Sequence, residues 1–236
     1  YLDSIPLVAI TGNVSNALIG TDSFQEIDIT GITLPITKHN YFVKSVEDLA
    51  PTIREAFRIA KSGRPGPVLV DVAKDVQTAL AEYVEAPVVP ADPMHAAKQV
   101  RIEEAAQVIN ASERPFIYFG GGLIASGAQE ELLALADKLD AVIGCSMMGI
   151  SGVPTDHPRF LGMEGMHGHY ASSIGMNEAD CIIACGARFN DRSTGKVSAF
   201  APHAKIVHID VDGAELCKTV HAAVALRGDL KFTLDE

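Results

Sequence analysis

The chain has 236 residues, 47% of them hydrophobic and 21% charged, and its 19 basic and 30 acidic side chains give a formal net charge of −11. That length suits one large domain or one and a half, and the composition is ordinary for a globular protein with a real core. The acidic balance argues against nucleic acid or an anionic membrane as a partner. No apolar run reaches the roughly 18 residues of a transmembrane helix, so we expect none.

Residues 1–6 contain neither a Met nor a basic segment, so we expect no signal peptide. An apolar run begins almost at once, which favours a chain that starts within a domain.

Residues 1–85 are expected to alternate strand, helix and strand. The predicted elements are a strand at 7–10, an amphipathic helix at 49–60 and a buried strand at 67–72, with a long polar stretch before residue 45. Ser45 and Asp48 resemble a capping box at the helix start. Gly63 is a natural helix stop.

A linker is expected at 86–100. Pro87, Pro90 and Pro93 recur every three residues with Ala and Val between them, which is typical of a stiff, extended segment. We place the domain boundary near Pro90.

Residues 101–236 are expected to form repeated βα units. The predicted elements are a helix at 101–111, a strand at 116–119, a helix at 127–139, a strand at 141–145, a long loop at 146–180, and strands at 181–185, 206–210 and 224–226. Such alternation predicts a doubly wound parallel sheet in a three-layer α/β sandwich. Ligands of these sheets bind at the carboxyl ends of the strands.

The four cysteines include no CxxC pair. Cys145, Cys181 and Cys185 lie in apolar runs and Cys217 in a predicted helix. We expect buried free thiols in a reducing cytoplasm.

A glycine turn, Gly120-Gly121-Gly122, follows a predicted strand and fits G-x-G-x-x-A through Ala125. Glycines let the backbone approach a diphosphate, and a helix N-terminus supplies N–H donors. A tight turn without any ligand is the competing reading. The usual acid of an NAD site is missing, since Asp140 lies at the wrong end of the next strand.

Other strand ends carry charge. Arg188 and Arg192 can pair with phosphates, Asp191 can orient an arginine, and Asp210 and Asp229 can meet hydroxyls. Together these ends favour a bound dinucleotide. The loop at 146–180 contains five methionines, which suit an apolar pocket wall. Its histidines lack the spacing and carboxylates of a zinc site, so no metal site is expected.

Four segments, 20–26, 62–76, 165–168 and 186–192, resemble the catalytic large subunit of the acetolactate synthase (acetohydroxyacid synthase) family, in the family's order and spacing. These enzymes use thiamine diphosphate to join two pyruvates, or pyruvate and 2-oxobutyrate, with decarboxylation. Their products feed isoleucine and valine synthesis. The resemblance implies that 1–85 is the C-terminal part of a pyrimidine-binding domain, 86–100 a linker, and 101–236 a Rossmann-like central domain that binds FAD without net redox chemistry.

The resemblance also assigns site residues. It implies catalytic or channel roles for Gln25, Phe24 and Lys74, and cofactor contacts for Arg64, Gly120, Gly121, Gly122, Ser146, Met147, Met166, His167, Gly186, Ala187, Arg188, Asn190, Arg192, Asp210, Val211 and Asp229. Three positions depart from the family pattern: Ser15 and Ala73 stand where proline is usual, and Asn190 where aspartate is usual.

The family implies three cofactors, FAD, thiamine diphosphate and Mg²⁺, the last two bound mainly through parts outside this chain. We therefore expect these residues alone to be inactive. The implied partners are 2-oxoacid substrates, further copies in a homodimer or tetramer, and a regulatory small subunit, in the cytoplasm. Alternatives are a sister thiamine enzyme (glyoxylate carboligase, pyruvate oxidase or sulfoacetaldehyde acetyltransferase), a stand-alone flavin-binding module, and a structural domain that has lost its ligand.

Overall fold

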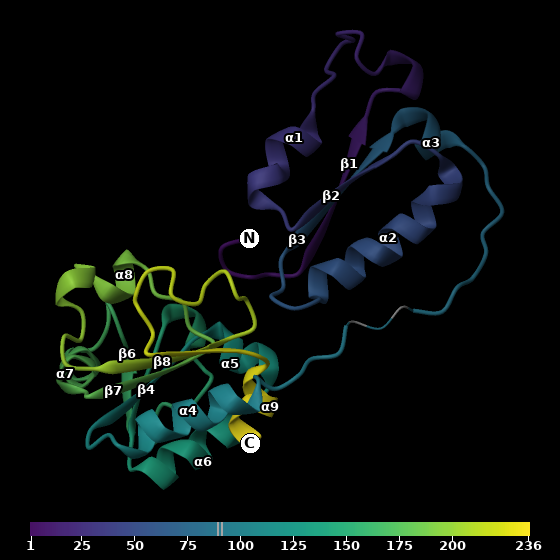
Figure 1. Cartoon of the computed structure of the whole chain (residues 1–236). Helices are drawn as coiled ribbons and strands as arrows, with labels where there is room; N and C mark the ends of the chain where they lie inside the picture. Colours follow the sequence, from purple (N-terminus) through teal and green to yellow (C-terminus); the bar gives the residue numbers. More distant parts are fainter. Residues whose placement is uncertain (89, 91) are drawn as a thin grey trace. The chain divides into compact units, whose positions relative to one another are not determined.

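The computed structural model describes residues 1–88, 90 and 92–236. The chain divides into two compact units, Tyr1–Pro93 and Met94–Glu236, which are drawn in purple to blue and in teal to yellow in Figure 1. Residues 89 and 91 of the expected linker 86–100 lie outside the described residues. No helix of the described part is both long and apolar enough to cross a bilayer.

The Tyr1–Pro93 unit is built on a three-stranded parallel sheet in the order β1-β3-β2. Its elements are β1 (Leu7–Asn13), the 3₁₀ helices η1 (Asn16–Leu18) and η2 (Leu34–Ile36), α1 (Ile29–Thr33), β2 (His39–Val43), α2 (Val46–Lys61), β3 (Pro67–Ala73) and α3 (Lys74–Thr78). The central strand β3 is almost wholly buried, and Ala56 and Ala60 of α2 pack against it. Its apolar run was therefore the easiest part of this unit to predict.

Two predictions for this unit are corrected. The polar stretch before residue 45 contains the strand β2, which the expected elements omitted. Ser45 precedes α2 as its N-cap residue, but its hydroxyl contacts the carboxylate of Glu47 instead of a backbone N–H of the first turn. The capping box is therefore not formed. Gly63 has a φ of +50° and follows Ser62 at the end of the helix, as expected of a helix stop.

The Met94–Glu236 unit contains a six-stranded, fully parallel sheet in the order β6-β5-β4-β7-β8-β9. The strands are β4 (Pro115–Phe119), β5 (Val142–Cys145), β6 (Phe160–Met163), β7 (Cys181–Cys185), β8 (Lys205–Asp210) and β9 (Val224–Arg227). After β4 the chain adds β5 and β6 on one side of that strand. It then returns and adds β7, β8 and β9 on the other side. This is the doubly wound sheet expected from the alternation of elements.

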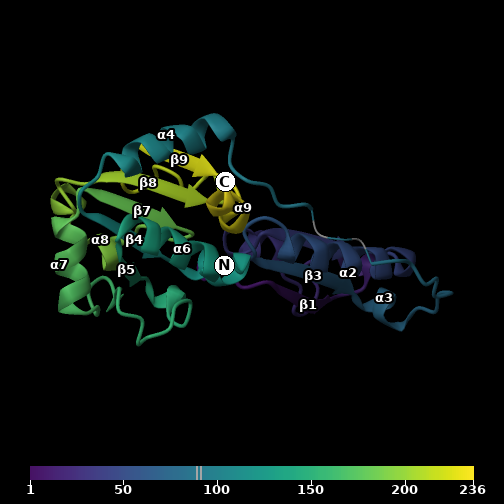
Figure 2. The same cartoon turned by 90° about the horizontal axis from the view of Figure 1, so that it is seen from below.

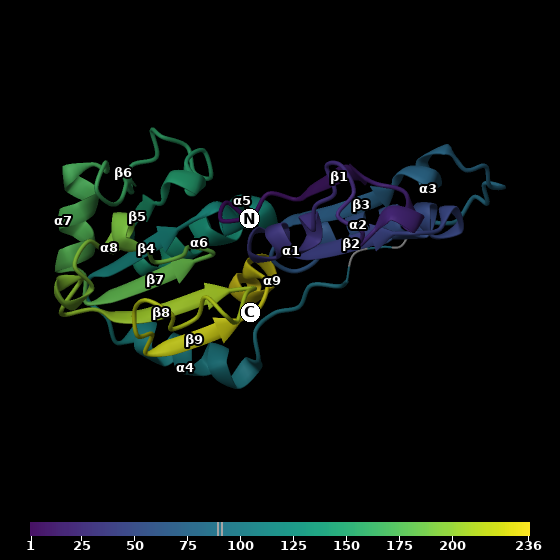
Figure 3. The same cartoon turned by 90° about the horizontal axis from the view of Figure 1, so that it is seen from above.

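Helices cover both faces of this sheet, which gives three layers (Figures 2 and 3). The helices are α4 (Gln99–Asn110), α5 (Gly121–Ser126), α6 (Gln129–Leu139), α7 (Tyr170–Glu178), α8 (Asp191–Thr194) and α9 (Leu230–Asp235), with 3₁₀ turns η3 (Met147–Gly149) and η4 (Val197–Ala199). Ile117 and Phe119 of β4 pack with residues of α4, α5, α6 and α9. Phe116 and Tyr118 face the opposite layer, where Met176 of α7 lies.

Three predictions for this unit are corrected. The glycine turn opens the short helix α5, and only then does α6 begin, because Gly127 in a left-handed conformation ends α5. The expected loop 146–180 contains β6 and α7. Cys217 lies outside any helix and is exposed, whereas the other three cysteines are buried free thiols as expected.

Candidate functional site at the carboxyl edge of the sheet

The carboxyl ends of the six strands are joined by a continuous row of backbone hydrogen bonds. The N–H groups that donate across neighbouring strands are those of Glu164 to Cys145 (2.7 Å), Ser146 to Phe119 (2.8 Å), Gly120 to Cys185 (3.1 Å), Gly186 to Ile209 (2.9 Å) and Gly228 to Asp210 (3.1 Å). Each segment of this unit that was expected to contribute to the site therefore begins at the carboxyl edge of the sheet, directly after the end of a strand. The sheet brings together segments that are far apart in the sequence.

The glycine turn packs directly on the turn after β7. The N–H of Gly122 donates to the carbonyl of Gly186 at 3.1 Å. A Cβ placed on Gly120 would lie 2.5 Å from the Gly186 oxygen, and one on Gly122 would lie 2.7 Å from the Gly186 Cα. Packing between the two turns thus accounts for Gly120 and Gly122 without any ligand. This agrees with the alternative interpretation of the motif as a tight turn that binds nothing.

The turn after β7, residues 186–192, carries Arg188 and Arg192 and is called the arginine turn. It is held by the N-terminal cap of α8. The side chain of Asn190 accepts the N–H groups of Arg192 (3.0 Å) and Ser193 (3.1 Å), and the Ser193 hydroxyl accepts the Asn190 N–H at 3.1 Å. Asp191 pairs with Arg192 at 3.3 Å, as the sequence suggested. Arg188 is half-buried at the start of this turn, whereas the Arg192 side chain is exposed.

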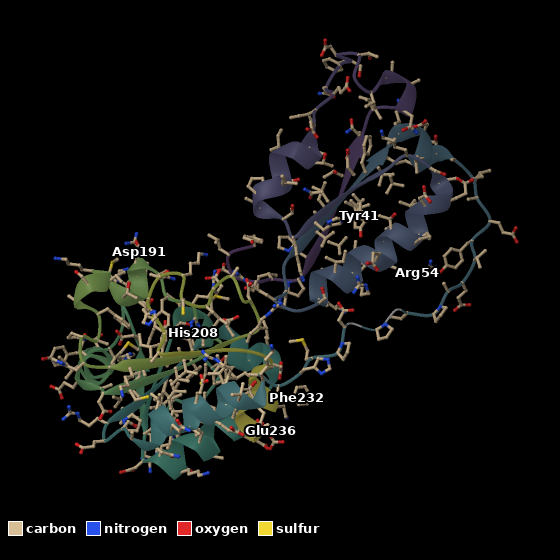
Figure 4. All side chains as sticks on the ribbon, in the orientation of Figure 1. Tyr41, Arg54, Asp191, His208, Phe232 and Glu236 are labelled. Atoms are coloured by element: carbon tan, nitrogen blue, oxygen red, sulfur yellow. The ribbon has the colours of Figure 1, made fainter. Side chains whose placement is uncertain are left out.

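A buried histidine that the sequence did not single out braces the same turn. His208 is 1% exposed, and its Nε2 lies 2.9 Å from the carbonyl of Ala187. Because a carbonyl only accepts, Nε2 carries the hydrogen and Nδ1 is bare. Its ring packs edge-on against Phe189 at 5.3 Å. Figure 4 shows His208 inside the unit and Asp191 at its periphery.

The strand-end carboxylates make local backbone contacts. Asp210 accepts the N–H of Asp212 at 2.8 Å. Asp229 caps α9 through the N–H groups of Lys231 (3.0 Å) and Phe232 (3.3 Å). Val211 follows Asp210 at the same edge and is half-buried.

Apolar side chains stand exposed at this edge. Met147 is 61% exposed and Met166 57% exposed, and His167 is exposed beside Met166. Ser146 joins β5 to them and is half-buried. Thioether side chains adapt to irregular apolar partners, so the edge offers surface for a planar ring.

Buried ionisable groups lie beneath the same edge. Burial raises the pKa of Glu164, and it raises the pKa of Tyr118 to about 12. Among the described residues, neither the Tyr118 hydroxyl nor the Glu164 Oε2 forms a well-aligned hydrogen bond, although the Ser193 hydroxyl lies near Tyr118 and the Ser172 and Ser173 hydroxyls lie near the Glu164 carboxyl. Sequence reasoning missed both, because nothing local marks a single Glu or Tyr as buried.

The remaining expected residues lie in the Tyr1–Pro93 unit. Phe24 is 87% exposed, and Gln25 is exposed with a φ of +63°. Lys74 opens α3 and is exposed, and its N–H approaches the Val14 carbonyl at 3.4 Å. Arg64 donates from Nε to the Ser4 hydroxyl at 2.9 Å and lies over the Tyr1 ring at 5.6 Å.

The residues of the Met94–Glu236 unit fit a flavin nucleotide in two respects. Exposed methionines offer a surface for a ring, and Arg188 offers a partly desolvated positive charge for a diphosphate. Gly120 and Gly122 do not argue for or against a flavin nucleotide, because their packing on Gly186 already accounts for them. Across the described part of the chain, no group of three or more His, Cys, Asp or Glu side chains is placed to hold a metal ion.

A parallel sheet with glycine and arginine turns at its carboxyl edge defines an α/β domain of the ligand-binding doubly wound class. Residues 102–236 match the family model described as the central domain of thiamine pyrophosphate enzymes, and the chain belongs to that family.

Individual proteins of this family with known names are also similar to the chain. The chain is 47% identical, over 99% of its length, to a protein of Methanocaldococcus jannaschii named as a probable acetolactate synthase large subunit. It is equally 47% identical over 99% of its length to the acetolactate synthase isozyme 1 large subunit of Escherichia coli, and 46% identical over its full length to an acetolactate synthase of Mycobacterium bovis. The chain spans 41%, 41% and 38% of these relatives.

Proposed function

We propose that the chain is part of an acetolactate synthase large subunit. The reaction is the decarboxylating condensation of two pyruvates, or of pyruvate and 2-oxobutyrate, to a 2-acetohydroxy acid. The observation that carries the proposal is 47% identity across 99% of the chain to relatives with that name. The match to the thiamine pyrophosphate enzyme family supports the cofactor.

Within this reaction, residues 94–236 bind FAD at the carboxyl edge of the sheet. Arg188 and Arg192 hold the diphosphate, the turns at 120–122 and 186–190 form the floor, and Met147, Met166 and His167 contact the ring system. Asp210 and Asp229 meet the sugar hydroxyls, and Val211 contacts the nucleotide beside Asp210. The support is the alignment of these segments at one edge and the exposed methionines.

In the Tyr1–Pro93 unit we propose that Gln25 and Phe24 lie at the thiamine cofactor, that Lys74 lines the substrate entrance, and that Arg64 contacts FAD. Thiamine diphosphate, with Mg²⁺ on its diphosphate, supplies the carbanion chemistry when bound. The chain's own groups position the reactants and exclude water. Phe24 supports this role, since an aromatic side chain left exposed has surface free for a ligand.

The large-subunit relatives also support a homo-oligomer and a regulatory small subunit as partners. Three buried free thiols support a reducing, cytoplasmic location.

The test is product analysis on the full-length protein that contains this chain. Incubated with pyruvate, thiamine diphosphate, Mg²⁺ and FAD, it should release 2-acetolactate and CO₂, and the purified protein should retain FAD by mass spectrometry. In parallel incubations, tartronate semialdehyde and CO₂ from glyoxylate, sulfite and acetyl phosphate from sulfoacetaldehyde and phosphate, or acetyl phosphate, CO₂ and H₂O₂ from pyruvate, phosphate and O₂, in place of acetolactate, would assign a sister enzyme. Retained flavin without any carboligation would assign a flavin-binding module.

A further inference from the structure

The loop of residues 20–26, called the Gln25 loop, is closed by a carboxylate of its own. The Oε2 atom of Glu26 accepts the N–H of Ser23 at 3.1 Å, and its Oε1 atom accepts the N–H of Gly20. The Glu26 N–H in turn donates to the Ser23 carbonyl at 3.0 Å. The two oxygens of one carboxylate therefore join the two ends of this loop.

The backbone of the Gln25 loop takes conformations that need such support. Gly20, Asp22 and Gln25 have φ angles of +78°, +57° and +63°. A Cβ on Gly20 would meet nothing within 4 Å, so the backbone conformation, and not a lack of space, favours glycine there. Non-glycine residues adopt this left-handed conformation at a cost, and they keep it where the surrounding contacts hold them in place.

The chain on either side of the Gln25 loop is anchored separately. Asn13, at the end of β1, donates from Nδ2 to the buried carboxylate of Asp71 at 2.6 Å and to the Ile27 carbonyl at 3.4 Å. Asn16 donates its N–H and its side-chain amide to Asp75 of α3, at 3.1 and 3.0 Å. The sheet and α3 thus fix the base of the loop, and the bonds of Glu26 hold its tip.

The donors that surround Glu26 favour its charged form. The N–H of Gly20 lowers the pKa of Glu26, and the N–H groups of Ser23 and Thr21 act in the same direction, against a smaller opposing effect of desolvation. An ionised carboxylate is acceptor-only, so both of its oxygens can receive an N–H. A glutamine in its place would offer one acceptor oxygen and an NH₂ group that cannot receive the second N–H.

We propose that Glu26 is a positioning residue, whose carboxylate holds the N–H groups of Gly20 and Ser23 and so fixes the loop tip that presents Phe24 and Gln25. Phe24 is 87% exposed and Gln25 is also exposed, so packing of their own side chains does not hold them. The inference rests on the proposed function for the role of these two residues at the thiamine cofactor. The hold of Glu26 on the loop does not depend on that role.

The experiment uses the full-length protein that contains this chain. Glu26→Gln keeps the size of the side chain and removes its charge and one acceptor oxygen, and Glu82→Gln makes the same change at an exposed position of the same unit. The first readout is amide hydrogen exchange of Gly20 and Ser23 at neutral pH. Leu18 is the internal reference, because its N–H donates to a backbone carbonyl outside the loop at 2.8 Å.

The second readout is kcat for acetolactate formation from pyruvate with thiamine diphosphate, Mg²⁺ and FAD. It is measured for wild type, Glu26→Gln, Gln25→Ala and the double variant. A residue that acts through Gln25 should matter little once the Gln25 side chain is gone. A general loss of structure, or a direct action of Glu26 on the reactants, would lower kcat by the same factor in both backgrounds.

In Glu26→Gln the amides of Gly20 and Ser23 should exchange about 2- to 10-fold faster than in wild type, the effect of losing one typical net hydrogen bond, while Leu18 is unchanged. The value of kcat should fall by a comparable factor when Gln25 is present and by almost none in the Gln25→Ala background. Glu82→Gln should match wild type in both readouts.

Unchanged exchange at Gly20 and Ser23, or equal acceleration at Leu18, would overturn the proposal, and so would an equal loss of kcat in both backgrounds. A wild type that forms no acetolactate, while its Gly20 and Ser23 amides depend on Glu26, would reject the proposed function and retain the hold of Glu26 on the loop. Should Glu26→Gln fail to fold, Glu26→Asp, which keeps the charge on a shorter side chain, is compared by the same two readouts.

Discussion

His208 donates its Nε2–H to the carbonyl of Ala187 at 2.9 Å, and so ties strand β8 to the turn that carries Arg188. Phe189 lies between His208 and Tyr118, with ring centroids 5.3 and 5.7 Å away. The buried imidazole of His208 and the buried phenol of Tyr118 thus both pack against the ring of Phe189, which belongs to the arginine turn. The turn is preorganised by its own chain before any ligand arrives.

Replacing His208 by leucine should destabilise the fold. The Ala187 carbonyl would lose its donor inside the protein, which typically costs about 1–3 kcal/mol. Urea unfolding followed by circular dichroism measures the loss, and His203→Leu, at an exposed position, serves as the control. Equal unfolding midpoints for His208→Leu and wild type would show that the bond contributes nothing.

The same residue should make stability depend on acid. Burial lowers the pKa of His208, while the Ala187 hydrogen bond and the charge of Glu215 partly offset this. Its contribution is therefore present above the ordinary histidine pKa of about 6.5 and is lost as pH falls through the lowered folded value. The acid slope of the unfolding free energy should be shallower in His208→Leu. An unchanged slope would assign the acid sensitivity elsewhere.

The sequence predicted which segments lie at the carboxyl edge of the sheet, but not the buried residues that lie next to them. Gly120 and Arg188 were expected to meet because each follows a buried strand, and parallel strands end at one edge. Their neighbours His208, Tyr118 and Glu164 were missed. Their burial comes from the packing of helices over the sheet, which no local pattern encodes.

Two short strands escaped prediction for a related reason. β6 has only four residues and contains Gly162, whose φ is +98°, so neither length nor composition marked it. β2 carries a histidine and an asparagine. Both strands exist because a more deeply buried neighbour supplies the hydrogen-bonding edge: β3, which is also longer, for β2, and β5, which is equally short, for β6.

Alanine at Gly122 should disturb the contact between the two turns. Its Cβ would lie 2.7 Å from backbone of Gly186, which cannot move aside as a side chain can. Overpacking of this kind costs about 1–3 kcal/mol. Gly121→Ala is the matched control, because its Cβ would come no closer than 3.3 Å to its neighbours, the Cβ and the carbonyl oxygen of Met148. Thermal unfolding of both variants should show the larger loss at Gly122, and a larger loss at Gly121 would contradict the turn contact.

Asn190 should be replaceable by aspartate but not by alanine. Its side chain accepts two N–H groups at the start of α8, and loss of such a cap costs about 1 kcal/mol. Asn190→Asp keeps the acceptor and should leave the free energy of unfolding within a few tenths of a kcal/mol of wild type. Denaturant titration of the two variants decides the point. Equal losses in both would mean that the amide N–H₂, and not the acceptor oxygen, matters.

Arg188 should contribute more to FAD affinity than Arg192. Arg188 is half-buried beside the Ala187 turn, whereas Arg192 is exposed and paired with Asp191, so water and salt screen its charge. A charge-assisted hydrogen bond of about 1.5–3 kcal/mol predicts a roughly 10- to 150-fold rise in the FAD dissociation constant for Arg188→Gln. Arg192→Gln should give a smaller rise, and Lys138→Gln, an exposed charge on α6, none. Flavin fluorescence titration of the full-length protein measures all three. If Arg192→Gln proved the more damaging, the diphosphate would lie over α8 instead of over the turn that His208 supports.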